Sequence, residues 1–126
     1  MKKEIFVIAL LALMLAAAIV NVRFLGKLTD DVVKIAEKAA NLATEGKWGE
    51  AETQAKAASK KWEDSETYTH IVLRHSEIER STEVLNGLLR EIYMREEGGV
   101  KGALAAAKSQ MTSLASIERV RLGSIF

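Results

Sequence analysis

The 126-residue sequence contains no cysteine and no proline. Without cysteine, the chain can form neither a disulfide framework nor a cysteine-based zinc site. Without proline, no residue breaks a helix by removing a backbone N–H group. Aromatic residues make up only 6% of the chain, whereas the strong helix formers Ala, Leu, Glu and Lys are abundant. The composition therefore predicts an all-α protein with room for one folded domain.

The chain also lacks an excess of charge of either sign. Its 18 Lys and Arg residues face 17 Asp and Glu residues, so the formal net charge is +1. Domains that bind nucleic acid usually carry a clear basic excess or a basic patch. We therefore expect no nucleic-acid partner.

A long apolar run occupies residues 5 to 20. As a helix this run is ~24 Å long. With the next few residues added, and Arg23 snorkelling to the surface, it can cross a hydrocarbon core of ~30 Å. The pattern predicts a single-pass membrane anchor over residues 1–27, followed by a bundle domain over residues 28–126.

The charges that flank the apolar run predict its orientation. Lys2 and Lys3 precede the run, whereas Arg23 and Lys27 follow it. Together with the free amine of the N-terminus, the first pair favours a cytoplasmic N-terminus. The bundle domain would then lie outside the cytoplasm, attached to the cell membrane.

A cleaved signal peptide is the alternative interpretation of the same run. Ala16 and Ala18 form a small-x-small site of the kind that signal peptidases cut. The apolar run continues past this site through Ile19 and Val20, which favours a retained anchor. In the alternative, the domain is exported and then secreted.

Beyond the anchor, apolar residues recur at steps of three and four in four segments, which is the spacing of one helix face. The four stripes are Leu28, Val32, Ile35, Ala39 and Leu42; Trp48, Ala51, Ala55, Ala58 and Trp62; Tyr68, Ile71, His75, Ile78, Thr82, Leu85, Leu89 and Ile92; and Val100, Leu104, Ala107, Met111 and Leu114. Their order predicts two helical hairpins that pack as a small antiparallel four-helix bundle.

Glycines mark the expected turns of both hairpins. Gly46 would end the first bundle helix, and Gly98 with Gly99 would end the third, because glycine adopts the left-handed conformation at helix ends. The third helix is expected to run unbroken from about residue 66 to residue 97. The two apolar residues that close the chain are expected to dock on the bundle.

The second stripe has a tryptophan at each end and alanine between them. Ala51, Ala55 and Ala58 would let a neighbouring backbone approach closely, and Trp48 and Trp62 would close the two ends of the shallow groove. We expect a close-packing surface; a ligand-stacking site is the alternative.

His75 stands out because it falls in an apolar stripe, between Ile71 and Ile78. A buried polar side chain needs a partner, and Glu79, one helical turn on, can supply it. The expected role is a buried polar layer that sets the bundle register; pH sensing is the functional alternative. On one continuous helix, His70 would point ~140° away from His75.

The sequence contains no recognisable catalytic pattern. Its serines lack the surroundings of a nucleophile elbow, its glycines lack phosphate-loop spacing, and its two histidines lack the spacing of four that is usual in helical metal pairs. We therefore expect a protein that is not an enzyme and that holds neither a metal nor a cofactor.

Several short motifs resemble those of a known family. They are W-x-x-A at Trp48 and Ala51, KKW at residues 60–62, RHSEIE at residues 74–79, and Ile-Phe at residues 125–126, all behind a short N-terminal anchor. This combination resembles domain-of-unknown-function family 4363, a family of short membrane-anchored helical proteins of Gram-positive, often spore-forming bacteria.

Two positions depart from that family's pattern. An acidic residue commonly precedes the histidine, where this chain has Arg74, and asparagine commonly precedes the final Ile-Phe, where it has Ser124. The resemblance covers nearly the whole chain and implies a location and an architecture. It implies no activity.

The functional hypothesis is a non-enzymatic, membrane-anchored domain that binds a protein partner in an envelope or spore-membrane assembly. The alternative is an extracytoplasmic sensor or small-ligand-binding bundle. In either case the residues expected at the partner or ligand surface are Trp48, Trp62, His75 and Glu79. A cavity between the second and third bundle helices would favour the sensor, and a filled core would favour the interaction domain.

Overall fold

The computed structural model describes residues 1–125, and these residues form helices without any strand. The helices are α1 (Lys2–Thr44), α2 (Trp48–Asp64), α3 (Glu66–Val72), α4 (His75–Tyr93) and α5 (Glu97–Ile125). The predicted all-α class is confirmed. The side chains at the chain end, Ile125 and Phe126, lie outside the described part, as does their expected docking.

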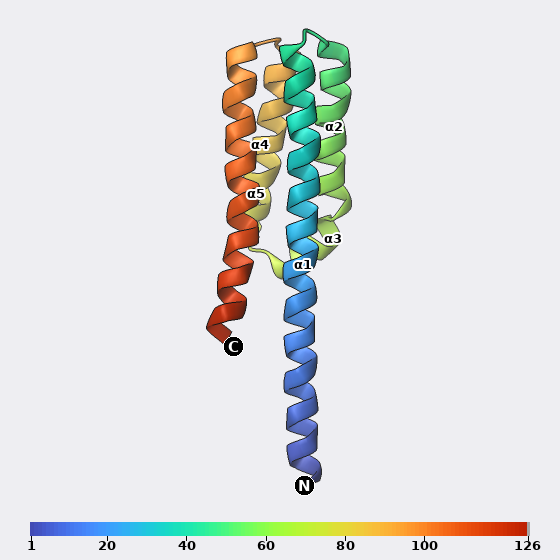
Figure 1. The fold of residues 1–126 in the computed structure, drawn as a ribbon, viewed down its shortest axis with the longest axis vertical. Helices are drawn as coiled ribbons and strands as arrows, with labels where there is room; N and C mark the ends of the chain where they lie inside the picture. The colour runs from blue at the N-terminus through green and yellow to red at the C-terminus, as the bar shows by residue number, and fades with distance from the viewer. Residues whose placement is uncertain (126) are drawn as a thin grey trace.

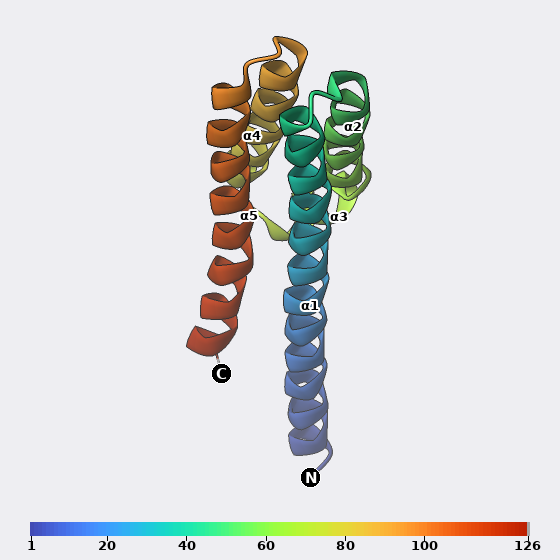
Figure 2. The ribbon, with the colours of Figure 1, turned by 45° about the horizontal axis from the view of Figure 1, so that its top comes forward.

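Four of the helices form an antiparallel bundle (Figure 1). α1 packs against α2 and α5, and α4 packs against the same two helices from the opposite corner. The chain runs up α1, down α2, up α4 and down α5, so every neighbouring pair is antiparallel (Figure 2). The short helix α3 joins α2 to α4 at the end of the bundle nearest the N-terminal half of α1. The predicted four-helix bundle is confirmed.

α1 is one unbroken helix of 43 residues, ~64 Å long. Its N-terminal half, residues 2–24, extends away from the bundle, and we call it the apolar rod. Its C-terminal half forms one wall of the bundle (Figure 1). The buried residues of α1 begin at Leu25, close to the expected domain boundary at residue 27. By length and composition, α1 is able to cross a membrane.

Two buried clusters fill the bundle. The cluster nearer the apolar rod contains Leu25, Leu28, Val32, Ala58, Trp62, Leu85, Ala107, Met111 and Leu114. The other contains Ala36, Ala39, Ala40, Ala43, Ala51, Ala55, Leu88, Ile92 and Val100. The second cluster is rich in alanine on both α1 and α2, so their backbones lie close together there. The alanines of the second stripe are buried, as a close-packing surface requires.

The buried face of α1 differs slightly from the predicted stripe. Ile35 and Leu42 are only partly buried, whereas Ala36, Ala40 and Ala43 are buried. The alanines of α1 face the alanines of α2, because two small-residue faces can approach each other more closely than two large ones. The larger apolar residues consequently lie beside this contact.

The turns α1–α2 and α4–α5 share one backbone arrangement. The N–H of Gly46 donates to the carbonyl of Ala43, and the N–H of Lys47 donates to that of Leu42. This pair of bonds is a Schellman motif, and Gly46 takes the left-handed conformation that it needs, with φ of 79°. Gly46 therefore ends α1 as predicted.

The second turn follows the same pattern one hairpin later. The N–H of Arg95 donates to the carbonyl of Ile92, and the N–H of Glu96 donates to that of Glu91. Arg95 occupies the left-handed position, with φ of 56°. The prediction that Gly98 and Gly99 end this helix is wrong: α4 ends at Tyr93, and both glycines lie in the first turn of α5.

The predicted third bundle helix is broken. Leu73 and Arg74 have extended backbones, with ψ of 155° and 145°, and separate α3 from α4. The break lets α3 turn across the end of the bundle, where Tyr68, Val72 and Leu73 pack on the core cluster. Covering that apolar end provides a physical reason for the break, which no local sequence signal marks.

Candidate functional site: the histidine–glutamate pocket

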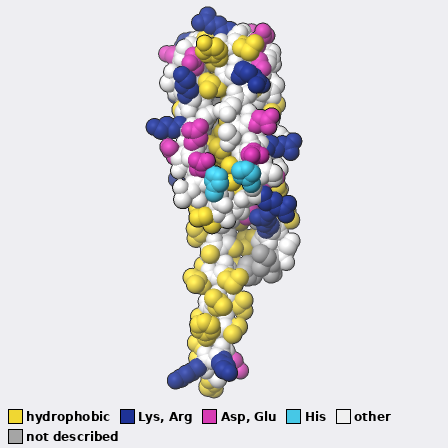
Figure 3. All heavy atoms as spheres, turned by 180° about the vertical axis from the view of Figure 1, so that it is seen from behind, with side chains coloured by type: hydrophobic (Ala, Val, Ile, Leu, Met, Phe, Trp, Pro, Cys, Tyr) yellow, Lys and Arg dark blue, Asp and Glu magenta, His cyan; other side chains and the backbone are white. Residues whose placement is uncertain are grey.

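The break between α3 and α4 brings the two histidines together. His70 near the end of α3 and His75 at the start of α4 line one open surface cavity of about 450 Å³. Both rings lie side by side on the surface, bordered by acidic side chains (Figure 3). The expectation that the two histidines point apart is wrong, because it assumed a continuous helix. We call this cavity the histidine–glutamate pocket.

His75 is exposed, which corrects the prediction of a buried ring. Its side chain is 76% exposed, and Ile71, the expected neighbour on the stripe, is 78% exposed. The predicted partner is confirmed: Nε2 of His75 lies 2.9 Å from Oε1 of Glu79. His75 begins α4 at the surface, where the apolar stripe is interrupted, and Ile78 is the first buried residue of α4.

His70 is held by the residue one turn before it. Its Nδ1 lies 3.0 Å from the backbone oxygen of Glu66, and its Nε2 lies 3.9 Å from the Glu66 carboxylate. Since a carbonyl oxygen only accepts, Nδ1 carries the proton in this arrangement. Each histidine thus presents Nε2 to a glutamate of its own helix.

The pocket as a whole is rich in acceptors. Three carboxylates line it, those of Glu66, Glu79 and Glu83, beside the two imidazoles and one cation, Arg90. Protonation of the imidazoles would turn both histidine–glutamate contacts into charge-assisted pairs. Among residues 1–125, no group of three His, Asp or Glu residues is placed to hold a metal ion. The arrangement suits recognition of a polar or cationic group at the surface.

The two tryptophans of the predicted surface lie in different places. Trp62 is buried, with 3% of its surface exposed, and its Nε1 donates to the hydroxyl of Thr82 at 3.2 Å. Thr82 lines the histidine–glutamate pocket, so Trp62 supports the pocket from the core side. Trp48 lies 14 residues away on α2, ~21 Å along its axis, and packs partly buried on the alanine-rich cluster. Of the four residues predicted at the partner or ligand surface, only His75 and Glu79 line the pocket; the prediction that Trp62 lies at that surface is wrong, because its ring is buried in the core.

The bundle does contain a buried polar layer, but His75 is not part of it. Ser81 of α4 is fully buried and donates to the carbonyl of Glu77 at 2.8 Å. Gln110 of α5 donates from Nε2 to Ser81 Oγ and to Glu77 Oε2, each at 3.1 Å. These bonds cross between α4 and α5, so they perform the register-setting role that was expected of His75.

A second polar group, which no sequence pattern indicated, lies where α1 leaves the bundle. Asn21 of α1 donates from Nδ2 to Oε2 of Glu118 at 3.0 Å, and it accepts a bond from the hydroxyl of Tyr68. Glu118 is 6% exposed, and its other oxygen lies 3.0 Å from Nη1 of Arg121. We call these four residues the anchor clamp.

The clamp affects the titration of Tyr68. Burial, and secondly the negative charge of Glu118, raise the pKa of its phenol above the ordinary value of 10.0. The ring of Phe24 lies against that of Tyr68, with centroids 4.2 Å apart. An asparagine directly after the apolar run is the only sequence feature that could have pointed to this group.

Comparison with known proteins identifies the family of the chain. The model of a family described as "Domain of unknown function (DUF4363)" matches residues 19–125. The match covers the bundle and the last turns of the apolar rod, so the chain belongs to this family, as the sequence motifs predicted. No curated protein and no solved structure matches the chain.

Proposed function

We propose that this protein is a single-pass membrane protein whose helical bundle recognises a protein partner outside the cytoplasm. The observation that carries the proposal is the bare apolar rod of α1. An 18-residue window of this helix is strongly apolar, and none of it is buried. The exposed apolar side chains are Ile5, Phe6, Val7, Ile8, Leu10, Leu11, Leu13, Met14, Leu15, Ile19 and Val20.

Energetics support a membrane around this rod. Leaving one such side chain in water instead of burying it costs about 1.5–3 kcal/mol. A helix is also a form in which a segment can cross the hydrocarbon core with its backbone groups satisfied. Because α1 continues into the bundle without a break, the anchor would hold the bundle rigidly and close to the membrane surface.

The orientation follows from the charges beside the rod. Lys2 and Lys3 favour a cytoplasmic N-terminus, which places the bundle outside the cytoplasm. Secretion after signal cleavage is the alternative topology, with cleavage after Ala18. Such cleavage would remove nearly all of the exposed apolar rod and leave a helix that starts at Ile19.

The histidine–glutamate pocket is the proposed partner surface. It is open, acidic and next to the bundle end from which the apolar rod extends (Figure 3), so it suits a cationic segment of a partner protein. Between α2 and α4 the core is filled by Ala58, Trp62 and Leu85. That filling supports surface recognition over the alternative of a sensor that encloses a small ligand.

A reporter fusion tests the topology. Alkaline phosphatase fused after Phe126 should be active in cells, because this enzyme is active only after export. A green fluorescent protein fused at the same position should be dark if exported through the general secretory route. The reverse pattern would overturn the orientation. Mass spectrometry of the purified chain should find the N-terminal peptide; a chain that starts at Ile19 would support the secreted form.

Partner capture tests the pocket. The double variant Glu66→Gln, Glu79→Gln should lose at least tenfold in crosslinked partner recovered from native membranes, while its melting temperature stays within a degree or two, because exposed ion pairs contribute only ~0–1 kcal/mol. The matched control is Glu50→Gln, Glu97→Gln, which removes the same charge at two exposed positions elsewhere on the bundle. Equal recovery from both variants would exclude the pocket as the partner surface.

A further inference from the structure

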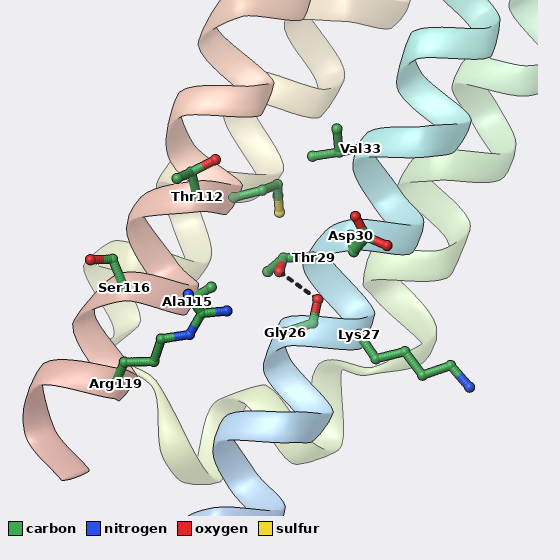
Figure 4. A pocket seen from close by; sticks show the side chains of 10 residues that line it. Gly26, Lys27, Thr29, Asp30, Val33, Thr112, Ala115, Ser116 and Arg119 are labelled. Carbon is green, nitrogen blue, oxygen red and sulfur yellow. Dashed lines mark hydrogen bonds between the residues drawn. The ribbon is translucent and has the colours of Figure 1, made fainter. Parts of the chain in front are cut away.

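A groove of about 670 Å³ runs between α1 and α5, at the end of the bundle nearest the apolar rod (Figure 4). Small residues create it: Gly26 on α1 faces Ala115 and Ser116 on α5. A Cβ added at Gly26 would meet no atom within 4 Å, so this space is not required for helix packing. The groove is on a different side of the bundle from the histidine–glutamate pocket, with which it shares no lining residue.

The groove carries one cation that the fold does not use. Arg119 extends from α5 into the groove toward Gly26 of α1, whereas the side chain of Lys27 points away from the groove (Figure 4). The ion pairs formed among residues 1–125 do not include Arg119. The carboxylate of Asp30, also on the rim, is paired with Lys34 at 2.9 Å. The free charge of the groove is therefore positive.

Hydroxyl groups complete the lining. Thr112 and Ser116 lie one turn apart on the same face of α5, and both are exposed (Figure 4). A guanidinium and hydroxyl groups are donors that commonly bind phosphate oxygens, and arginine can donate two parallel bonds to one phosphate. The chemistry of the groove thus points to an anion that carries both a phosphate and hydroxyl groups.

The height of the groove points to the source of that anion. The bond between Asn21 and Glu118 fixes α5 beside the top of the apolar rod. Because α5 runs antiparallel to α1 (Figure 1), Arg119 lies at about the level of Val20, where the apolar run ends. The polar headgroup layer of one leaflet is ~5–8 Å thick. If α1 spans the membrane, the guanidinium of Arg119 lies at the base of this layer.

We propose that the α1–α5 groove binds the headgroup of an anionic phospholipid, with Arg119 on the phosphate and Thr112 and Ser116 on the headgroup hydroxyls. This inference rests on the proposed membrane anchoring. A lipid bound there would touch both the anchor helix and the last helix of the bundle. It would hold the bundle upright against the membrane, because it would keep α1 and α5 together at headgroup height.

The experiment uses the full-length chain in a non-ionic detergent, titrated with phosphatidylglycerol and followed by native mass spectrometry. The variant Arg119→Gln should bind phosphatidylglycerol about fivefold more weakly than the natural chain. The control Lys101→Gln removes the same charge from the same helix, farther from the anchor, and should bind as the natural chain does. Phosphatidylcholine, which has no net charge, should bind weakly to all three proteins.

Two results would overturn the proposal. One is equal affinity for phosphatidylglycerol in Arg119→Gln and Lys101→Gln, which would show that Arg119 does not contact the lipid. The other is complete displacement of phosphatidylglycerol by inorganic phosphate, which would assign the groove to a soluble anion. Extraction of native membranes with alkaline carbonate tests the anchor separately: release of the chain would contradict membrane anchoring, whatever the lipid titration shows.

Discussion

Asn21 on α1 donates a hydrogen bond to Glu118 on α5, with 3.0 Å between Nδ2 and Oε2, across a sequence separation of 97 residues. The same asparagine accepts a bond from Tyr68 on α3. Three helices therefore meet at one amide, at the point where α1 leaves the bundle. This contact fixes the direction of the anchor relative to the bundle, since a rotation of α1 would break both bonds.

Replacing Glu118 with alanine should destabilise the bundle by about 1–3 kcal/mol, because it leaves Asn21 with an unpaired donor in a partly buried site. Glu118→Gln should cost less, since its amide oxygen can still accept from Asn21. Denaturant unfolding followed by helical circular dichroism measures both. Glu63→Ala, at an exposed position of α2, is the control. Equal losses for Glu118→Ala and Glu63→Ala would show that the clamp does not stabilise the fold.

Tyr68 gives the clamp a pH dependence on the alkaline side. Its pKa is raised in the folded protein, mainly by burial and secondly by the charge of Glu118. The unfolded chain therefore releases this proton first as the pH rises, so the stabilising effect is complete below about pH 10 and is lost as the pH rises through the folded pKa.

Tyr68→Phe should consequently lose less stability between pH 9 and pH 11 than the natural chain does. Thermal melts across this range measure the difference. Tyr93→Phe removes a phenol that is 74% exposed and should leave the alkaline slope unchanged. A Tyr68→Phe variant with the natural slope would mean that the phenol titrates alike in the folded and unfolded chains.

Local patterns were sufficient to predict the helices and most of the core. The stripe from Trp48 to Trp62 has a clear helical period and could be assigned from spacing alone. The break at Leu73 and Arg74 could not, because its cause is tertiary: α3 turns to cover the end of a core built by other helices. The wrong prediction that His75 is buried has the same cause, because it assumed one helix continuing through residues 73 and 74.

The two polar groups of the bundle were unpredictable for a related reason. The bond from Asn21 to Glu118 and the bonds from Gln110 to Ser81 and Glu77 depend on the register between helices. Helical spacing predicts which face of a helix is apolar, but it does not predict which residues of two faces lie opposite each other. A partner 97 residues away therefore leaves no local trace in the sequence.

The alanine contact between α1 and α2 should tolerate little added volume. Ala55 is 1% exposed and lies in the alanine-rich cluster. Ala55→Leu should therefore lower the free energy of unfolding by ~1–3 kcal/mol through overpacking. Ala57→Leu adds the same atoms to the same helix at a position that is only partly buried, and it should have a much smaller effect. Similar losses for the two variants in urea unfolding would contradict close packing at Ala55.

The turns of the two hairpins have the same backbone conformation but hold different residues at the left-handed position. Substitutions at the two positions should therefore change stability in opposite directions. Arg95 occupies the left-handed position that Gly46 occupies in the first turn, with φ of 56° and 79° respectively. A side chain in this conformation costs on the order of 1–3 kcal/mol, which glycine avoids. Arg95→Gly should therefore stabilise the bundle by about 1 kcal/mol, and Gly46→Ala should destabilise it by a similar amount.

Arg95→Ala separates backbone strain from loss of the charged side chain. Alanine keeps the Cβ atom, so the strain remains and the stability should stay close to that of the natural chain. Denaturant midpoints of the three variants, measured under one set of conditions, should rank Arg95→Gly highest, Arg95→Ala near the natural chain and Gly46→Ala lowest. An equal gain for Arg95→Gly and Arg95→Ala would assign the effect to the arginine side chain and would reject the backbone explanation of this turn.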